Sequence, residues 1–183
     1  QIQLLPDKAQ AAKMKADGCD MVLMGTVIRE TIGLMGEAKK IGFAPFWLGA
    51  TPVCVLEIPM LGKELVEGLW AGCAFEVPYR DTAKGKIKDW AESYFKTFGA
   101  EPNSQASIGH NTITTFAHYA KLAGKDLTGQ KMLDALESGN AFQDIFGSPP
   151  TKFSKTNHLA TTITQVQVVK NGRWVLVKDG LSF

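Results

Sequence analysis

Short apolar runs alternate with amphipathic segments along the first part of the chain. Met21–Met24 and residues 46–48 are apolar throughout, and they lead into Gly25 and Gly49. Between them, the apolar positions of residues 28–41 recur at the three- and four-residue spacing of a helix. Buried apolar strands separated by amphipathic helices are typical of a parallel sheet with helices packed on it. The pattern therefore predicts an α/β fold.

Helical spacing also marks the start of the chain and its middle. The further predicted helices are 8–17, a short one around 61–67, 82–98, 111–123 and 129–137. Residues 69–77 alternate small and large apolar side chains and predict another strand, which Pro78 ends. Residues 142–155 are rich in loop-forming side chains and predict no regular element.

The end of the chain carries the clearest hairpin signal. Residues 161–169 and 173–178 alternate apolar and polar positions, and Asn171 and Gly172 between them favour a tight turn. We therefore expect an antiparallel edge on the otherwise parallel sheet.

Composition excludes several classes of protein. The 183-residue chain is 45% hydrophobic and 21% charged, with a formal net charge of +2 at pH 7. This length suffices for one domain or two small lobes with a core, and the balanced charge gives no reason to expect a nucleic-acid partner. The apolar runs are far shorter than the roughly 20 residues of a membrane-spanning helix. A soluble globular protein is indicated.

The three cysteines, Cys19, Cys54 and Cys73, match no zinc or redox spacing. Small buried thiols and a Cys54–Cys73 disulfide are both compatible with their apolar surroundings. The chain begins with Gln1, and no export signal pattern follows it. We therefore expect that any signal peptide was removed or was never present.

Small polar residues follow both predicted strands that end in glycine. Thr26 comes directly after Gly25, and Thr51 follows Gly49 with Ala50 between them. Because the carboxyl ends of adjacent parallel strands face one crevice, hydroxyl groups and free helix N–H groups collect there and can bind a ligand carboxylate. The alternative is that each threonine only caps the following helix. We expect the function to lie around Thr26 and Thr51.

The order of these parts resembles a known family. The segments that carry the resemblance are "GCDMVLMGT", "EAKKIGF", "PFWLGATP", "FEVPY", "WAESYFKTFGAEPN", "GHN" and "QVQVVKNGRWVLV". Together they resemble the carboxyl-terminal half of the periplasmic solute-binding proteins of ABC transporters, in the branched-chain amino acid-binding group. This resemblance implies the type I periplasmic binding protein fold, a Rossmann-like three-layer parallel sheet, here incomplete and with a C-terminal β-hairpin.

The resemblance also implies two lobes joined by hinge crossings. Residues 1–74 and 164–183 would form part of the second lobe, and residues 77–162 part of the first. The crossings would lie near 74–77 and 163–165. Since the amino-terminal strands of both lobes are absent, apolar faces would be left uncovered. We therefore expect a fragment that a missing N-terminal portion or another chain completes.

The family's ligand contacts, transferred by position, imply a candidate binding site. Its residues are Gly25, Thr26, Val27, Ala50, Thr51, Pro52 and His110. His110 would start a first-lobe helix and face the cleft, and the alternative is a capping or core histidine. Amino-acid binders of the group hold the ligand ammonium with an acidic residue where this chain has Thr51, and have an aromatic residue where it has Val27. Because a neutral threonine cannot offset the burial of an ammonium, an aromatic or aliphatic carboxylate is a candidate beside an amino acid.

The function expected from the resemblance is the solute-binding component of an ABC importer, periplasmic or extracellular, with an ABC permease as partner. It would use no cofactor, metal or catalytic residue. A ligand-sensing domain of a receptor or regulator is the alternative. An α/β enzyme is disfavoured because the chain lacks a phosphate loop, a dinucleotide glycine pattern and a nucleophile elbow.

Overall fold

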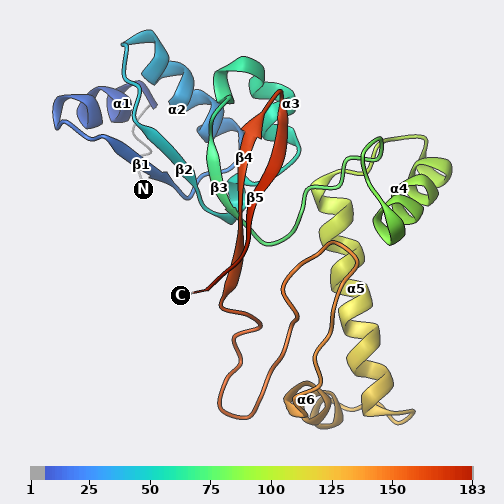
Figure 1. The fold of residues 1–183 in the computed structure, drawn as a ribbon. Helices are drawn as coiled ribbons and strands as arrows, with labels where there is room; N and C mark the ends of the chain where they lie inside the picture. The colour runs from blue at the N-terminus through green and yellow to red at the C-terminus, as the bar shows by residue number, and fades with distance from the viewer. Residues whose placement is uncertain (1–6, 183) are drawn as a thin grey trace. The chain divides into compact units, whose positions relative to one another are not determined.

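The computed structural model describes residues 7–182, which form two compact units (Figure 1). Unit 1 comprises the chain up to Cys73 together with Gln165–Asp179. Unit 2 comprises Ala74–Thr164 and the residues after Asp179. The chain therefore leaves unit 1 after Cys73 and returns to it after Thr164.

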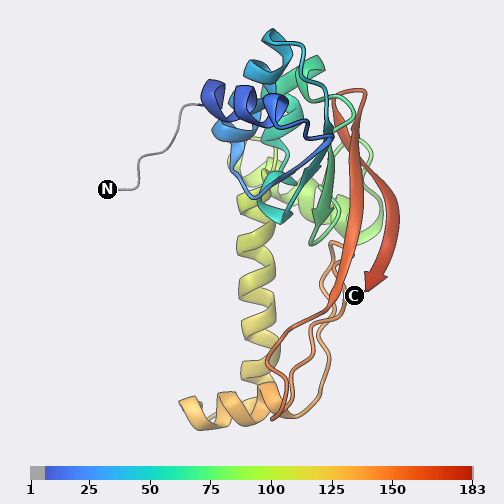
Figure 2. The same ribbon diagram turned by 90° about the vertical axis from the view of Figure 1, so that its left-hand side faces the viewer.

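Unit 1 is built on a five-stranded sheet within the described residues, and Figure 2 shows α1 and α2 together on one side of the strands. In chain order the elements are α1 (Asp7–Ala16), β1 (Met21–Met24), α2 (Ile28–Lys40), β2 (Phe46–Gly49), the 3-10 turn η1 (Thr51–Val53), α3 (Glu57–Gly62), the 3-10 turn η2 (Lys63–Val66), β3 (Trp70–Cys73), β4 (Ile163–Lys170) and β5 (Arg173–Ser182). The α/β fold predicted from the sequence is confirmed.

The sheet has the mixed pairing that the sequence predicts. The strand order is β1-β2-β3-β4-β5, with β1, β2 and β3 parallel and β4 antiparallel to β3. Asn171 and Gly172 join β4 to β5 with positive φ angles of 53° and 72°, which a tight hairpin turn requires. The Glu67 carboxylate accepts the N–H of Asn171 at 3.0 Å and so ties this turn to the segment before β3.

One face of β1 is covered and the other is not. Val22 and Met24 are buried, whereas Met21 and Leu23 are 52% and 65% exposed. Met21 pairs with Phe46 in the parallel register, and Phe46 is 47% exposed. Paired residues of adjacent strands point to the same side of a sheet. Met21, Leu23 and Phe46 therefore form an uncovered apolar face.

Unit 2 contains helices and a loop-rich segment. Its helices are α4 (Gly85–Phe98), α5 (Ser104–Ala123) and α6 (Gly129–Glu137), and isolated bridges such as Phe142 to Thr151 hold the segment that follows α6. Tyr119 and Phe146 are completely buried. The Tyr119 hydroxyl donates to the Asn140 carbonyl at 3.0 Å, which fixes the loop against α5.

Several predicted boundaries are wrong. The strand predicted at 69–77 ends at Cys73, and the short helix predicted around 61–67 is split between α3 and η2, where Lys63 has a positive φ. The helix predicted at 111–123 begins at Ser104, because the Asn103 side chain accepts the N–H of Ala106 at 2.9 Å and caps it there. Between Asp7 and Ser182 no helix is long and apolar enough to cross a membrane.

Candidate functional site

Two turns lie side by side at one edge of the unit 1 sheet. Turn 1 is residues 25–27, after β1, and turn 2 is residues 50–52, after β2. Met24 pairs with Gly49 at the ends of the two strands, and the Ala50 N–H donates to the Met24 carbonyl at 2.8 Å. The register thus brings together six of the seven residues that the sequence singled out: Gly25, Thr26, Val27, Ala50, Thr51 and Pro52.

Turn 1 exposes Gly25 and Val27 and leaves Thr26 partly buried. The Thr26 hydroxyl lies 2.7 Å from the hydroxyl of Thr31, which is completely buried in α2. The residue at the N-cap of α2 is Val27, with extended backbone and no capping side-chain bond. The alternative that Thr26 caps this helix is therefore wrong, and its hydroxyl is held by Thr31 instead.

Turn 2 has an outer and an inner side. Thr51 and Pro52 are exposed, whereas the next residues, Val53 and Cys54, are buried. The Val53 N–H donates to the Ala50 carbonyl at 2.9 Å, so a tight 3-10 turn presents Thr51 outward. No side-chain capping bond is formed at Ala50, which is the N-cap residue of this turn.

The chemistry available at the two turns is that of neutral hydrogen-bonding groups. Thr26 and Thr51 each offer a hydroxyl that can donate or accept, and the other four residues offer backbone groups next to small or apolar side chains. None of the six is titratable, so they contribute no charge at any pH. Such a surface can orient a carboxylate or carbonyl oxygen but provides no counter-charge for an ammonium.

His110 belongs to unit 2 and lies inside α5, not at its start as the sequence suggested. Its ring centroid is 5.6 Å from that of Trp90 and 5.7 Å from that of Phe146, which it meets edge to face. His110 as a whole residue is partly exposed. This packing is that of a histidine built into an aromatic cluster.

Residues outside the seven candidate positions support turns 1 and 2. They are Thr31, the disulfide-bonded pair Cys54 and Cys73, and Trp174, whose indole N–H donates to the Val55 carbonyl at 2.9 Å. Thr31 occupies an ordinary position on the inner face of a helix, so its spacing gives no signal. The other contacts join segments that come together only through the sheet. The sequence leaves the disulfide as one of two alternatives and does not indicate the Trp174 contact.

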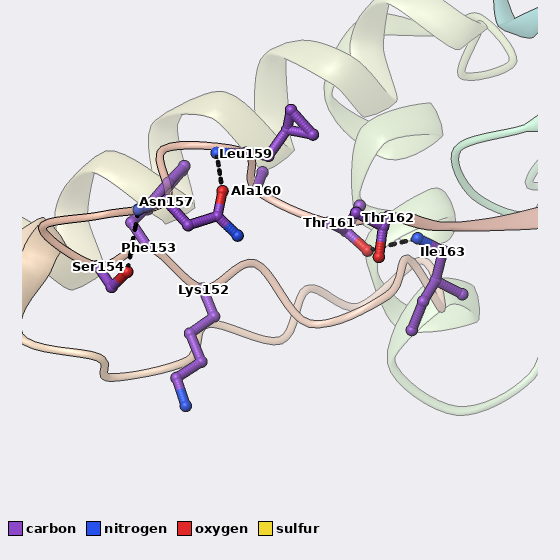
Figure 3. Close-up of a pocket in the computed structure, with 9 residues that line it drawn as sticks. All are labelled: Lys152, Phe153, Ser154, Asn157, Leu159, Ala160, Thr161, Thr162 and Ile163. Atoms are coloured by element: carbon purple, nitrogen blue, oxygen red, sulfur yellow. Dashed lines mark hydrogen bonds between the residues drawn. The ribbon is translucent and has the colours of Figure 1, made fainter. Parts of the chain in front are cut away.

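A separate hollow of about 400 Å³ lies in unit 2, lined by the loop of residues 152–163 (Figure 3). Two of its polar groups bond within the loop: the Asn157 side-chain oxygen accepts the Leu159 N–H at 2.8 Å, and the Thr161 hydroxyl accepts the Ile163 N–H at 3.0 Å. Within residues 7–182 no group of His, Cys, Asp and Glu side chains is arranged to hold a metal ion. Neither feature adds a reactive centre to the two turns.

A family model described as periplasmic binding protein matches residues 7–173 of the chain. Among curated proteins no match is found. The family match covers both units and includes all seven residues of the candidate site.

Solved structures share the fold. One is a branched-chain amino acid ABC transporter from Thermus thermophilus with bound valine, at 18% identity and a TM-score of 0.79, covering 97% of this chain and 50% of the other. A fatty acid ABC transporter substrate-binding protein from Thermomonospora curvata has 22% identity and a TM-score of 0.81, covering 96% and 46%. A leucine-binding protein from Thermotoga maritima has 19% identity and a TM-score of 0.66, covering 94% and 47%. The chain thus spans about half the length of these proteins.

Proposed function

The chain belongs to the periplasmic binding protein family, and from this premise we propose that it captures a small organic solute as part of the extracytoplasmic binding component of an ABC importer. The observation that carries the proposal is the register of β1 and β2, which sets turns 1 and 2 next to one another. Ligands of open α/β sheets bind beyond the carboxyl ends of the strands. In this proposal the protein does no chemistry, and an ABC permease is its partner.

We infer that unit 1 corresponds to the second lobe and unit 2 to part of the first, with hinge crossings near residues 74–77 and 163–165. Lobe closure would remove water from the ligand around fixed hydrogen-bond donors, and hinge strands would absorb the motion. His110 is the candidate that the first lobe contributes. Its ring, held by Trp90 and Phe146, is suited to stack on a ligand without moving.

The neutral side chains of turns 1 and 2 favour a ligand with a hydrogen-bond acceptor. Thr26 and Thr51 can donate to a carboxylate oxygen, and the acidic residue that would hold an ammonium is absent from turn 2. An aromatic or aliphatic carboxylate therefore suits these turns at least as well as an amino acid.

The uncovered apolar face supports the proposal that this chain is one piece of a complete binding protein. Strands of a parallel sheet are normally covered on both faces, yet Met21, Leu23 and Phe46 are exposed. The solved structures are about twice as long as this chain. We propose that the portion present in those proteins and absent from this chain covers the face formed by these three residues.

The Cys54–Cys73 disulfide supports an extracytoplasmic location. Disulfides persist in the periplasm and outside the cell, whereas the cytoplasm keeps most thiols reduced. We therefore propose that the protein works in the periplasm or at the cell exterior.

Native mass spectrometry of the full-length protein, purified without refolding, tests this function. We expect the native mass to exceed the polypeptide mass by that of one small molecule, which denaturation releases and mass spectrometry identifies as a carboxylate or amino acid. Calorimetric titration with the released compound then gives its affinity. The Thr26→Val and Thr51→Val variants should each bind it about tenfold more weakly, because each loses one hydrogen bond to a charged oxygen.

Thr97→Val is the matched control, since Thr97 lies on α4 and donates to the Ser93 carbonyl. It removes a threonine hydroxyl at a position outside the candidate site and should leave the affinity unchanged. Full-length protein that carries no ligand, and that gives no heat with L-leucine, L-valine or benzoate, would contradict the proposed function.

A further inference from the structure

Turn 2 is held to the rest of unit 1 through its buried side, and its other side faces solvent. Thr51 and Pro52 face solvent, and the two residues that follow are buried: Val53 completely, and Cys54 with 8% of its surface exposed. The N–H groups of Val53 and Cys54 donate to carbonyls of the turn itself, at Ala50 and Thr51. These local bonds shape the turn but do not fix it to the sheet.

Besides the Ala50 N–H, which donates to the Met24 carbonyl of β1 at 2.8 Å, three contacts fix turn 2. The Val53 side chain packs against Gly49 so closely that a Cβ at that glycine would lie 2.6 Å from it. Trp174 donates its indole N–H to the Val55 carbonyl at 2.9 Å, just beyond the turn. The third contact is covalent: the disulfide joins Cys54 to Cys73.

Cys73 lies at the end of β3, where the chain leaves unit 1. Cys73 is the last residue of β3 and is completely buried, and β3 pairs with β2 through Ala71 and Gly49. Ala74, the next residue, is the first of unit 2. The disulfide therefore fastens the turn that carries Thr51 to the end of a paired strand, at the point where the chain leaves unit 1.

We propose that the Cys54–Cys73 disulfide positions Thr51 for ligand binding. This inference rests on the proposed function in one respect, that Thr51 contacts the ligand. The β1–β2 and β2–β3 pairings and the burial of Leu34, Met35 and Ala38 in α2 involve neither sulfur, so the sheet keeps its own support without the bond. Turn 2, by contrast, loses its covalent fastening. Reduction by a dithiol transfers two electrons and two protons to the disulfide, leaves two protein thiols, oxidises the dithiol to its own disulfide and removes the covalent link between the turn and β3.

Hydrogen exchange in the ligand-free, full-length protein tests the first half of this inference. The proteins to compare are the unchanged protein, the Cys54→Ser/Cys73→Ser double variant and the Cys19→Ser control, which removes the exposed free thiol of Cys19. We expect the backbone amides at positions 53 and 54 to exchange about tenfold faster or more in the double variant. Amides of β1, β2 and α2 should keep their rates, and Cys19→Ser should match the unchanged protein. Equal acceleration throughout unit 1, or none at turn 2, would overturn the proposal.

A double-mutant cycle tests the second half. Thr51→Val is introduced into the unchanged protein and into the double cysteine variant, and the affinities for L-leucine, L-valine and benzoate are measured by calorimetry. We expect Thr51→Val to weaken binding about tenfold when the disulfide is present and by less than about threefold when it is absent, because a released turn no longer holds the hydroxyl on the ligand. An equal loss in both backgrounds would show that the disulfide does not act through Thr51.

Failure of this inference and failure of the proposed function give different results. If the unchanged full-length protein binds none of the three probes, the proposed solute class is wrong. The exchange rates of turn 2 are measured without ligand, and they still decide whether the disulfide fastens the turn.

Discussion

Unit 1 carries its candidate residues at the end of a hydrogen-bonded sheet, whereas unit 2 holds His110 by packing of side chains. In unit 1 the pairing of Met24 with Gly49 sets the relative position of turns 1 and 2. In unit 2 the ring of His110 packs against Trp90 and Phe146. A register depends on the backbone of whole strands, but a ring cluster depends on a few individual residues. Single substitutions should therefore have different consequences in the two units.

The ring cluster of unit 2 depends on a loop that has little regular structure. Phe146 is completely buried, and its ring lies 4.9 Å from that of Trp90. Asp144 organises this loop: its carboxylate accepts the N–H of Phe146 at 2.8 Å and the side-chain amide of Asn111 at 2.8 Å. One carboxylate thus links the loop to α5, the helix that carries His110.

The largest expected effect is that of Phe146→Ala. Removing a completely buried phenylalanine leaves a cavity and should destabilise unit 2 by about 3–5 kcal/mol. Amides of α4 and α5 should exchange faster in the full-length protein, while those of β1 and β2 in unit 1 keep their rates. Hydrogen exchange by mass spectrometry measures both.

Phe98→Ala is the control for this substitution, because Phe98 is the same residue type in unit 2 but is 66% exposed. It should cost less than about 1 kcal/mol. Faster exchange in both units of the Phe146→Ala variant would contradict the comparison, since it would mean that the two units unfold together.

A smaller effect is expected for Gly49→Ala in unit 1. The new Cβ would lie 2.6 Å from the Cβ of buried Val53, so turn 2 must shift, at a cost of about 1–3 kcal/mol. Gly25→Ala is the matched control, because a Cβ there meets no atom within 4 Å. Thermal unfolding of the full-length variants measures the difference.

The Gly49→Ala/Val53→Ala double variant sharpens this test. Shortening Val53 removes the atoms that the new methyl group meets, so the two substitutions together should cost less than the sum of their separate effects. Strict additivity would show that the packing of Val53 on Gly49 does not fix turn 2.

How well the sequence predicts an element depends on how clearly the ends of that element are marked. β1 and α6 agree with the predicted segments residue for residue, because a continuous apolar run or a regular helical spacing is bounded on both sides by turn residues. α5 was predicted seven residues too short, because Pro102, Asn103 and Ser104 together look like a turn although Asn103 is a cap. Caps and turns use the same residue types, and only the following hydrogen bonds distinguish them.

For the candidate site, the sequence predicts the positions that follow the strands but not their supports. Gly25 and Ala50 could be expected side by side from the rule that parallel strands end at one edge. The partner of Thr26 is Thr31, a buried hydroxyl on a helix face that otherwise contains apolar residues, and no spacing rule indicates it. The sequence does not decide between free thiols and the disulfide, because the two cysteines are brought together only by the pairing of β2 and β3.

The smallest expected effect concerns a surface contact of unit 2, the ion pair between Arg80 and Glu101. Two nitrogens of the guanidinium lie 2.6 and 2.9 Å from the carboxylate oxygens of Glu101, and this hydrogen bonding lowers the pKa of Glu101 below its usual 4.5. Because the folded state has the lower pKa, the pair stabilises the protein above pH 4.5, and this contribution is lost as the pH falls through the folded value. The Glu101 side chain is 55% exposed, so water and salt screen the attraction and keep it weaker than the packing of Phe146.

An NMR titration of the Glu101 carboxyl carbon measures this contact directly. Glu101 should titrate below pH 4.5 in the unchanged protein and at a higher pH in Arg80→Met, which removes the guanidinium. Glu92→Gln, which removes a longer 3.3 Å contact to the same arginine, should leave the Glu101 titration in place. An unaltered Glu101 pKa in Arg80→Met would mean that the ion pair does not persist in solution, and the side-chain support of unit 2 would then come from its buried rings and from hydrogen bonds such as that of Asp144 with Asn111.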